Sequence, residues 1–484
     1  MRQLRIIRLI AFASLFALIP ATPILAQTTD ETIDTNKASI VEQHDLSMRG
    51  MIRLVHETPE QFEKIWNERR RQQQQVLAHN MLASKALQIT QEIDWQWATG
   101  LINYPYFRHR ETGQPVADDW KPRLQAINSI PFNDETSLGK PLFDQLIQAW
   151  LHDEAGRRIK QDSALKLGDN RWLRANFDAL EAHIRNAKVK AYFMAKLLAE
   201  HIDDNGAKNL TDIIGRFEQQ GGDAAQVTKF STAATQELAE PKDHRAFTYQ
   251  TVDGVDLQVH VFEAQSNKDT IKQKTPVLIW FHGGSWSTGH WSYCPVICRS
   301  LQNRGFTIVQ VEYRTSQRFD GTPLNALADA YKAIDWTIAN AAQLNIDTQK
   351  LMVAGFSSGG ALASQMAIFN SDKVKAAAYM SGGFDPASDT WYNSVVGPLR
   401  DTKKLSPLRM VHAKSPPQII FHAKDDEMCP YRDAEGLQQK LKEYQINNQL
   451  ISFEQGGHFF VFKNPADRQR ISTELNRFLD QLHW

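Results

Sequence analysis

Cysteine is scarce in this chain of 484 residues, which contains three: Cys294, Cys298 and Cys429. So few cysteines exclude a fold held together by a network of disulfides, and a packed apolar core must supply most of the stability. Cys294 and Cys298 lie four positions apart. On a helix they would share a face without the geometry of a disulfide, and we therefore expect free thiols.

An excess of charge of one sign is also missing, because 55 Lys and Arg residues balance 55 Asp and Glu residues. Without a net field or a local basic patch, we expect no nucleic-acid partner. Apolar residues make up 42% of the chain and charged residues 23%, which is ordinary for a soluble globular protein. This composition argues against wholesale disorder and against a protein with several membrane spans.

The chain begins with the layout of a secretory signal peptide. Three arginines occur within the first eight residues, and the apolar run of residues 9–19 follows. That run has about half the length of a helix that spans a bilayer. It is followed by Pro20 and a short tail that ends at Ala26. We therefore predict that residues 1–26 are a cleaved signal peptide, that the protein is periplasmic or secreted, and that no integral membrane domain is left after cleavage.

The chain is too long for one ordinary core, and its periodicity changes near residue 241. Thr58 precedes Pro59 at a predicted helix start, and apolar residues then recur at the three-to-four spacing of amphipathic helices. We predict an all-α domain of unknown role over residues 58–241 and a flexible linker over residues 27–57.

Beyond residue 241, unbroken apolar runs alternate with helical stretches. This alternation is typical of a mostly parallel sheet with helices on both faces. Asp253-Gly254 predicts a hairpin in front of that sheet. We predict an α/β domain over residues 245–484, with strands near residues 277–281, 306–311, 351–354, 376–380, 419–421 and 450–453.

One predicted strand runs directly into the sequence Gly355-Phe356-Ser357-Ser358-Gly359, and a helical stretch follows. A G-x-S-x-G turn between a strand and a helix is so tight that it needs small residues two places either side of the serine, and it holds the hydroxyl out of the sheet. A glycine-rich turn without chemistry is the simpler alternative. The position between strand and helix favours Ser357 as a nucleophile.

A serine hydroxyl needs a base, and the base needs an acid that fixes its tautomer and steadies its charge. His458 follows the last predicted strand, and we predict that it is the base. Asp385 follows the strand after the Ser357 helix, whereas Asp425 and Asp426 follow the next strand. Periodicity alone does not choose among these three acids.

Attack on an acyl carbon creates an oxyanion, which needs hydrogen-bond donors fixed in advance. The sequence His282-Gly283-Gly284 leaves an earlier strand, and its glycines allow backbone N–H groups to turn inward. We predict an oxyanion hole formed by the N–H groups of Gly283, Gly284 and Ser358. We expect His282 to be a structural residue rather than the general base.

Together these motifs resemble an α/β-hydrolase of the carboxylesterase kind over residues 245–484. The H-G-G-x-W segment from His282 to Trp286 is similar to that of bacterial feruloyl and acetyl esterases and kynurenine formamidases, and is related to the H-G-G-G of hormone-sensitive-lipase-like esterases. Ser285 stands in place of the third glycine of the lipase-like form. The resemblance implies a mostly parallel α/β-hydrolase sheet covered by helices.

The resemblance also favours one of the acids. Residues 422–430 resemble the family pattern H-G-x-x-D-x-x-V-P, in which the acid comes four residues after the histidine. That position is Asp426. The chain departs from the pattern at Ala423, where the family has glycine, and at Cys429, where it has valine.

These observations predict an exported serine hydrolase that cleaves a small-molecule carboxylic ester through an acyl-enzyme intermediate, with Ser357, His458 and Asp426 as the triad. No metal or organic cofactor is implied. A serine peptidase or amidase of the same fold is the first alternative. The second is a helical binding or assembly module, with an unknown protein partner, attached to a vestigial hydrolase domain.

Overall fold

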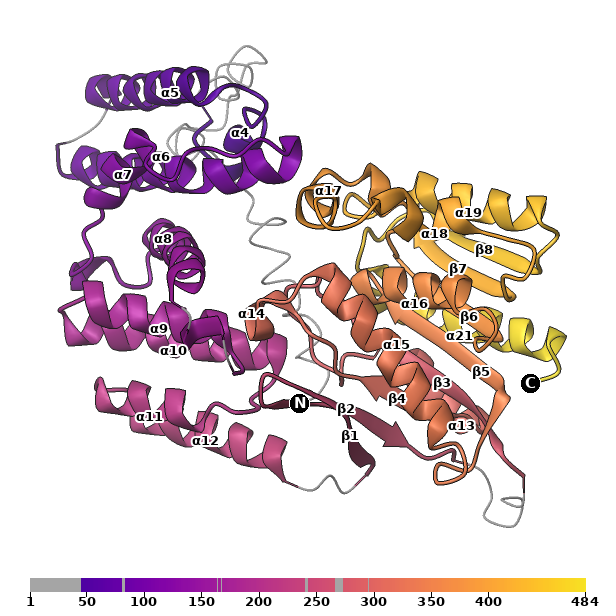
Figure 1. Cartoon of the computed structure of the whole chain (residues 1–484). Coiled ribbons are helices and arrows are strands. Elements are labelled where there is room, and N and C mark those ends of the chain that lie inside the picture. Colours follow the sequence, from indigo (N-terminus) through magenta and orange to yellow (C-terminus); the bar gives the residue numbers. More distant parts are fainter. Residues whose placement is uncertain are drawn as a thin grey trace.

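The computed structural model of the chain describes residues 45–80, 83–162, 164–166, 168–239, 243–265, 273–294 and 296–484. These residues form a helical part, which ends at residue 239, and an α/β part, which begins at residue 243 (Figure 1). The predicted signal peptide and residues 27–44 of the predicted linker lie outside the described residues.

The helices of the helical part begin at recognisable capping residues. The Thr58 hydroxyl accepts the N–H of Gln61 at 3.3 Å in front of α5, and the Asn186 side chain accepts two N–H groups at the start of α10. The elements are α4 (Met48–Ile52), α5 (Pro59–Asn80), α6 (Ala83–Thr112), α7 (Lys121–Asn128), η2 (Glu135–Ser137), α8 (Pro141–Gln161), η3 (Ala164–Lys166), α9 (Arg171–His183), α10 (Ala187–Asn205), α11 (Thr211–Gln219) and α12 (Ala224–Leu238).

Aromatic side chains fill the core of the helical part. The Phe62 ring stacks on Tyr104 at a centroid distance of 3.8 Å, and the Trp66 indole donates a hydrogen bond to the Trp97 carbonyl at 3.0 Å. The prediction of an all-α region in front of the sheet is confirmed. Within the described residues, no helix combines the length and the apolar composition needed to cross a bilayer.

Residues 45–57 differ from the flexible linker that the sequence predicts. They include α4, and the side chains of Met51 and Val55 are buried in the helical core. Arg108 of α6 donates a hydrogen bond to the Val55 carbonyl at 3.0 Å. A few apolar residues suffice to anchor a short segment when a neighbouring helix supplies the hydrogen bonds. Because that helix is distant in sequence, residues 45–57 carry no pattern from which these contacts could be predicted.

Eight strands form one sheet in the order β1-β2-β4-β3-β5-β6-β7-β8. The strands from β4 onward in this order pair in parallel, whereas β1 and β2 are antiparallel additions. The predicted hairpin turn joins β1 to β2, and both Asp253 and Gly254 have the positive φ of such a turn. The strands are β1 (Arg245–Val252), β2 (Val255–Phe262), β3 (Thr275–Phe281), β4 (Thr307–Val311), β5 (Ile346–Phe356), β6 (Ala376–Met380), β7 (Gln418–Ala423) and β8 (Asn448–Phe453).

Helices cover both faces of this sheet, as predicted. The apolar sides of α15, α16 and α19 pack on one face, and those of α13, α20 and α21 pack on the other. The bounds are α13 (Val296–Arg304), α14 (Ser316–Phe319), α15 (Pro323–Ala339), α16 (Ser358–Phe369), η5 (Pro386–Ser388), α17 (Thr390–Val396), η6 (Thr402–Leu405), α18 (Pro407–Met410), α19 (Tyr431–Glu443), α20 (Phe460–Lys463) and α21 (Pro465–Gln481).

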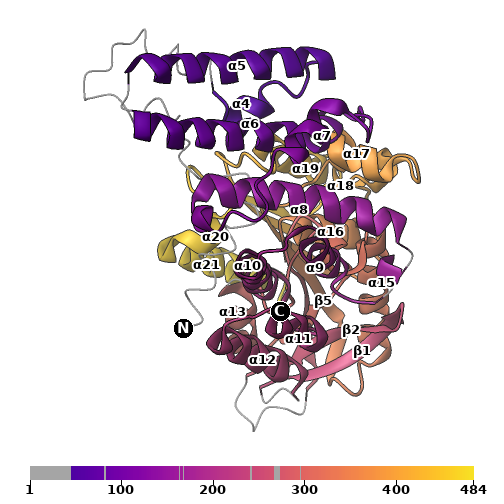
Figure 2. The same ribbon diagram turned by 90° about the vertical axis from the view of Figure 1, so that its left-hand side faces the viewer.

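The helical part lies beside the edge of the sheet at which the parallel strands end (Figure 1). Its helix α6 contacts α17, and its helix α9 contacts α14. In the view turned by 90°, helices α8 to α10 lie in front of the sheet (Figure 2). Because ligands of open parallel sheets bind outside the carboxyl ends of the strands, the helical part adjoins the edge where a functional site is expected.

Candidate active site

Ser357 occupies a tight turn between β5 and α16. Its backbone has φ 55° and ψ −123°, a conformation that an L-residue adopts only when its surroundings impose it. A methyl group added at Gly359 would lie 2.1 Å from the Phe281 carbonyl oxygen, and one added at Gly355 would lie 2.1 Å from the Gly359 carbonyl oxygen. At both glycines of the G-x-S-x-G sequence a side chain would collide with backbone atoms, so only glycine fits.

Ser357, His458 and Asp426 form one hydrogen-bonded row. His458 Nε2 lies 2.9 Å from Ser357 Oγ, and His458 Nδ1 lies 2.9 Å from Asp426 Oδ2. The residues follow three different strands, β5, β8 and β7. Their exposed fractions are 6%, 5% and 7%, so water has little access to the row. Such a row can pass the serine proton to an imidazole whose charge a carboxylate balances.

Asp426 is held as a carboxylate by several donors. Its Oδ1 accepts the N–H groups of Met428 and Cys429 at 2.9 and 2.8 Å, and His422 Nε2 lies 3.3 Å from Oδ2. Burial acts to raise the pKa of Asp426, but the hydrogen bonds from His422 and His458 and the charge of His458 outweigh burial and hold this pKa far below its usual range. The group is therefore ionised at neutral pH.

The other two candidate acids have different partners. Asp425 is exposed and accepts the N–H groups of Gly456 and Gly457 at 3.1 and 2.8 Å, which ties down the loop that carries His458. Asp385 is paired with Arg409, whose guanidinium donates to both carboxylate oxygens at 2.8 and 2.7 Å. The structure thus brings Asp426, and neither Asp425 nor Asp385, to His458.

The predicted oxyanion residues lie against the serine. A methyl group added at Gly283 would be 3.2 Å from Ser357 Cβ, which places this backbone beside the hydroxyl. In the part of the chain that the structure describes, the N–H groups of Gly283 and Gly284 donate to no protein acceptor. Ser358 is the first residue of α16, and an N–H group in that first turn has no partner within the helix. These N–H groups are thus available to a negative charge.

His282 has a structural position. Its Nδ1 lies 2.8 Å from the Gly283 carbonyl, and its ring stacks on Tyr313 at a centroid distance of 4.1 Å. The Tyr313 hydroxyl donates to the His282 carbonyl at 2.7 Å. Burial lowers the pKa of His282 to about 3, so the ring is neutral at physiological pH.

Two residues near the site were not predicted as part of it. Tyr313 binds the His282 carbonyl at the end of β3, and His422 Nε2 lies 2.9 Å from the Cys429 carbonyl and 3.3 Å from Asp426 Oδ2. Both occur in segments that the family resemblance covers, and that resemblance was the only available signal.

Within the described residues, no group of three or more His, Cys, Asp or Glu side chains could hold a metal ion.

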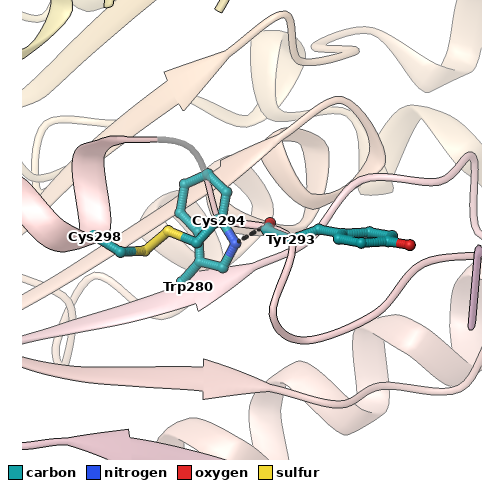
Figure 3. Close-up of a disulfide and its surroundings, with 4 residues drawn as sticks. All are labelled: Trp280, Tyr293, Cys294 and Cys298. Carbon is teal, nitrogen blue, oxygen red and sulfur yellow. Dashed lines mark hydrogen bonds between the residues drawn. A yellow bond between two sulfur atoms is a disulfide. The ribbon is translucent and has the colours of Figure 1, made fainter. Parts of the chain in front are cut away.

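The expectation of free thiols at Cys294 and Cys298 is wrong. These two residues form a disulfide, with a Cα–Cα distance of 6.1 Å that such a bond accommodates (Figure 3). The helical spacing that argued against it does not apply, because Cys294 lies in the loop before α13 and only Cys298 is on the helix. Nearby, the Trp280 indole donates to the Tyr293 carbonyl at 3.0 Å. Cys429 is free.

Several of the known proteins to which this chain is similar are named as ester hydrolases. The model of BD-FAE, an α/β-hydrolase esterase family, matches residues 265–393. The chain is 23% identical over 240 residues to a probable carboxylic ester hydrolase, LipM, of Mycobacterium tuberculosis, with 43% of this chain and 54% of LipM covered. It is 32% identical over 99 residues to the carboxylesterase NlhH of the same species, with 20% of this chain and 30% of NlhH covered.

Among solved structures, the apo form of Thermogutta terrifontis esterase 2 is similar, with 24% identity, a TM-score of 0.46, and coverage of 50% of this chain and 96% of that one. The chain spans about half the length of LipM and under a third of that of NlhH. The resemblance that the motifs of the second half indicate is confirmed by these findings. The predicted fold class is confirmed, because a helical region precedes a mostly parallel sheet of eight strands that helices cover.

Proposed function

We propose that this protein is a serine carboxylesterase whose triad is Ser357, His458 and Asp426. The observation that carries the proposal is the buried row of hydrogen bonds from Ser357 Oγ to His458 and on to Asp426. Ser357 Oγ attacks the ester carbonyl carbon while His458 Nε2 takes the hydroxyl proton. His458 then gives that proton to the departing alcohol oxygen, and an acyl-enzyme is left.

Water completes the reaction in the second half. His458 Nε2 removes a proton from water as the water oxygen attacks the acyl carbon, and the proton returns to Ser357 Oγ when the acid is released. Asp426 keeps a hydrogen on Nδ1 of His458, which leaves Nε2 free as a base, and balances the charge of the imidazolium. The ionised state of Asp426 at neutral pH supports this role.

The N–H groups of Gly283, Gly284 and Ser358 serve as the oxyanion hole. Each tetrahedral intermediate places a negative charge on the former carbonyl oxygen, next to Ser357. The contact of Gly283 with Ser357 Cβ and the unused N–H groups of the two glycines support this assignment. One donor of this kind contributes about a hundred- to thousandfold in rate.

An ester panel tests the proposal. The purified protein should hydrolyse nitrophenyl esters of graded acyl length, and the Ser357→Ala variant should lose at least about 10³-fold in kcat. Nitroanilide and peptide amide substrates in the same assay separate an esterase from the peptidase or amidase alternative. Hydrolysis by Ser357→Ala at the wild-type rate would exclude the proposed mechanism.

We further propose that the protein is exported, with residues 1–26 as the signal peptide. The Cys294–Cys298 disulfide supports export, because such bonds persist in oxidising compartments and are rare in the cytosol. Fractionation of the producing cells should give the mature chain, without its first 26 residues, outside the cytoplasm. A cytoplasmic, full-length product would overturn this proposal.

A further inference from the structure

Residues 282–290, here called the β3 loop, have an unusual backbone. Gly284 and Gly289 have φ of 130° and 123°, and Ser285 and Trp286 have φ of 54° and 56°. Non-glycine residues keep such conformations only where their surroundings hold them. The backbone–backbone hydrogen bonds inside the loop run from the N–H groups of Ser287 and Thr288 to the Gly284 carbonyl and leave the end of the loop unbound. The shape of the loop therefore depends on contacts from outside.

Two of those contacts come directly from the helical part. The Gly289 N–H donates to the Asp204 carbonyl in the last turn of α10 at 3.0 Å. His290 Nε2 lies 2.7 Å from Glu237 Oε1 of α12. Gly206 lies against the same ring, since a methyl group added there would be 2.6 Å from His290 Cδ2. The end of the β3 loop is thus fixed to two helices of the other part.

The pair of Glu237 and His290 is shielded from water. The side chains are 19% and 11% exposed, respectively. Burial acts to raise the pKa of Glu237, but the charge and hydrogen bond of His290 outweigh it and lower this pKa to about 2. A contact shielded in this way restrains the loop more firmly than an exposed pair on the surface would.

Helix α14 provides a further restraint on the β3 loop, beside the packing of Trp286 on Trp391 and Tyr392 of α17. The N–H of Ser316 donates to the Trp286 carbonyl at 2.9 Å, and the N–H of Gln317 donates to the Ser287 carbonyl at 3.0 Å. These bonds hold the two residues that follow the strained Ser285. The position of α14 therefore contributes to the position of the middle of the loop.

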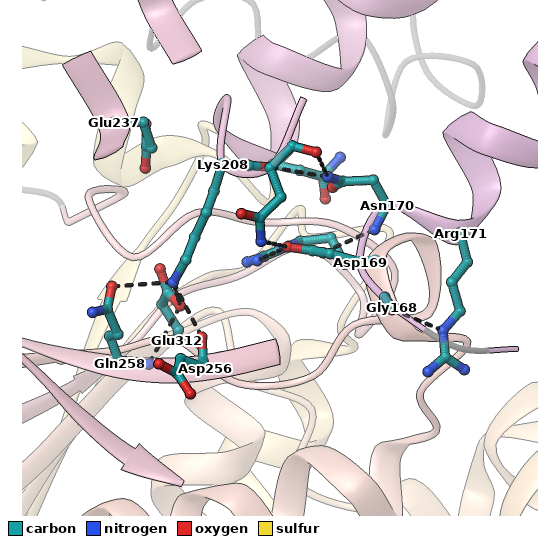
Figure 4. A network of polar contacts seen from close by, with 12 residues as sticks. Gly168, Asp169, Asn170, Arg171, Lys208, Glu237, Asp256, Gln258 and Glu312 are labelled. Atoms are coloured by element: carbon teal, nitrogen blue, oxygen red, sulfur yellow. Dashed lines mark hydrogen bonds and ion pairs between the residues drawn. The ribbon is translucent and has the colours of Figure 1, made fainter. Parts of the chain in front are cut away.

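The helical part holds α14 in turn. The Asn205 side chain donates to Gln317 Oε1 at 3.0 Å, and Arg318 makes two hydrogen bonds to Asp169, at 2.8 and 2.6 Å. Figure 4 shows another contact of this interface, in which Lys208 of the helical part reaches Gln258 and Glu312 of the α/β part and binds Glu312 at 3.0 Å. Direct and indirect contacts thus converge on one loop.

We propose that the helical part is a working component of the active site, in which the Asp204 carbonyl and the Glu237 carboxylate are positioning groups for the β3 loop. They keep the N–H groups of Gly283 and Gly284 beside the carbonyl oxygen of the ester that Ser357 attacks. The inference rests on the proposed esterase function, and it assigns a role to the half of the chain that carries none of the triad.

The test compares Glu237→Ala with a matched control, Glu135→Ala. Glu135 lies in the same helical part and also forms an ion pair, with Lys188, but it is exposed and forms no contact with the β3 loop. Glu237→Ala should lower kcat for a nitrophenyl ester about tenfold, a smaller loss than that of a whole oxyanion donor. KM should stay within about twofold, because an oxyanion hole acts on the transition state. Glu135→Ala should match the wild type.

Two further readouts separate positioning from general support of the fold. A trifluoromethyl ketone, which places an oxyanion in the hole, should bind Glu237→Ala more weakly by the same factor as kcat/KM. Hydrogen exchange of peptides that cover residues 282–290 should be faster in Glu237→Ala and unchanged in Glu135→Ala. Glu237→Gln, which keeps an oxygen for His290, should recover most of the loss. If Glu237→Ala does not fold, His290→Gln tests the same contact from the loop side.

The outcomes distinguish this inference from the proposed function. Wild-type kcat, inhibitor affinity and loop exchange in Glu237→Ala would overturn the inference while leaving the esterase in place. No ester hydrolysis by the wild type would remove the proposed function, and the exchange measurement would still decide whether Glu237 holds the β3 loop.

Discussion

The three candidate aspartates share one functional group but have different environments. Asp426 is buried among donors and contacts the imidazole, Asp425 is exposed and binds the N–H groups of the loop that carries His458, and Asp385 is neutralised by Arg409. A carboxylate can only orient an imidazole that it touches. The contacts of each residue therefore determine what its substitution should do.

Substitution of the two neighbouring acids should give different losses. Asp426→Asn should lower kcat by about 10³-fold or more with little change in KM, because an amide no longer fixes the tautomer of His458 or balances its charge. Asp425→Asn should cost about tenfold at most, since an amide oxygen still accepts an N–H from the loop. Steady-state ester kinetics checks both, and a larger loss for Asp425→Asn would reverse the assignment of the acid.

Asp204 should make stability depend on pH. Burial, followed by the charges of Glu200 and Asp203, raises the pKa of Asp204 to about 8. The folded protein therefore keeps this proton between about pH 4 and pH 8 while the unfolded chain has lost it, and the free energy of unfolding falls as the pH rises through this range.

The Asp204→Asn variant removes this titration. Its free energy of unfolding in urea should fall less steeply between pH 5 and pH 8, by on the order of 1 kcal/mol per pH unit, than that of the wild type. Asp119→Asn, at an exposed position of the helical part that does not contribute to the pKa of Asp204, is the control and should follow the wild-type slope. Parallel slopes for wild type and Asp204→Asn would mean that the Asp204 carboxyl is not held neutral.

At the scale of elements, the turn between β5 and α16 brings the serine close to the end of β3. Gly359 lies so close to the Phe281 carbonyl that no side chain fits, and Gly283 of the β3 loop lies against Ser357 Cβ. The strand, the helix and the loop are therefore assembled as one unit, and a change at their contact should affect stability as well as chemistry.

Gly359→Ala should destabilise the protein strongly. The added methyl group would lie 2.1 Å from the Phe281 carbonyl oxygen, and backbone on both sides leaves it nowhere to move, so we expect a loss of about 3 kcal/mol or more in the free energy of unfolding. Gly215→Ala in α11 is the control, because no atom lies within 4 Å of the added group and alanine favours a helix by about 1 kcal/mol. Urea unfolding of both variants checks the contrast, and equal stabilities would contradict it.

At the scale of the whole molecule, the two parts meet through charges that are out of contact with water. The Arg318 and Asp169 side chains are 6% and 2% exposed, and each belongs to a different part. Removal of one member of a buried pair leaves the other charge without compensation, which is costly. The two parts should therefore unfold together rather than as independent domains.

Asp169→Asn should lower the free energy of unfolding by about 3 kcal/mol, because Arg318 stays buried without a counter-charge. Glu135→Gln breaks an exposed pair that water screens, and its stability should stay close to that of the wild type. Urea titration followed by tryptophan fluorescence checks both variants. Loss of the helical part alone, in a separate first transition of the wild type, would contradict the picture of a single cooperative unit.

Much of the α/β part could be predicted from sequence, because buried parallel strands appear as unbroken apolar runs. The turn around Ser357 could be predicted because it is too tight for any side chain at Gly355 and Gly359. The prediction also named Ser357, His458 and Asp426, which the structure places in contact. For Asp426 the residues alone left the choice open, and only the family resemblance favoured it.

The remaining features depend on contacts between distant residues. The disulfide forms because Cys294 lies in the loop before α13 and not on the helix. The four-residue spacing of the two cysteines does not reveal the path of that loop. The packing of residues 45–57 on α6 and the contact of Glu237 with His290 likewise join segments that have no common pattern in the sequence.

The central claim is that Ser357 is the nucleophile of this fold. Reaction of the intact protein with a fluorophosphonate, followed by mass spectrometry of its peptides, tests that claim most directly. We predict one adduct, on Ser357, which His458→Ala abolishes. An adduct on a different serine, or ester hydrolysis that continues without any adduct, would contradict the account.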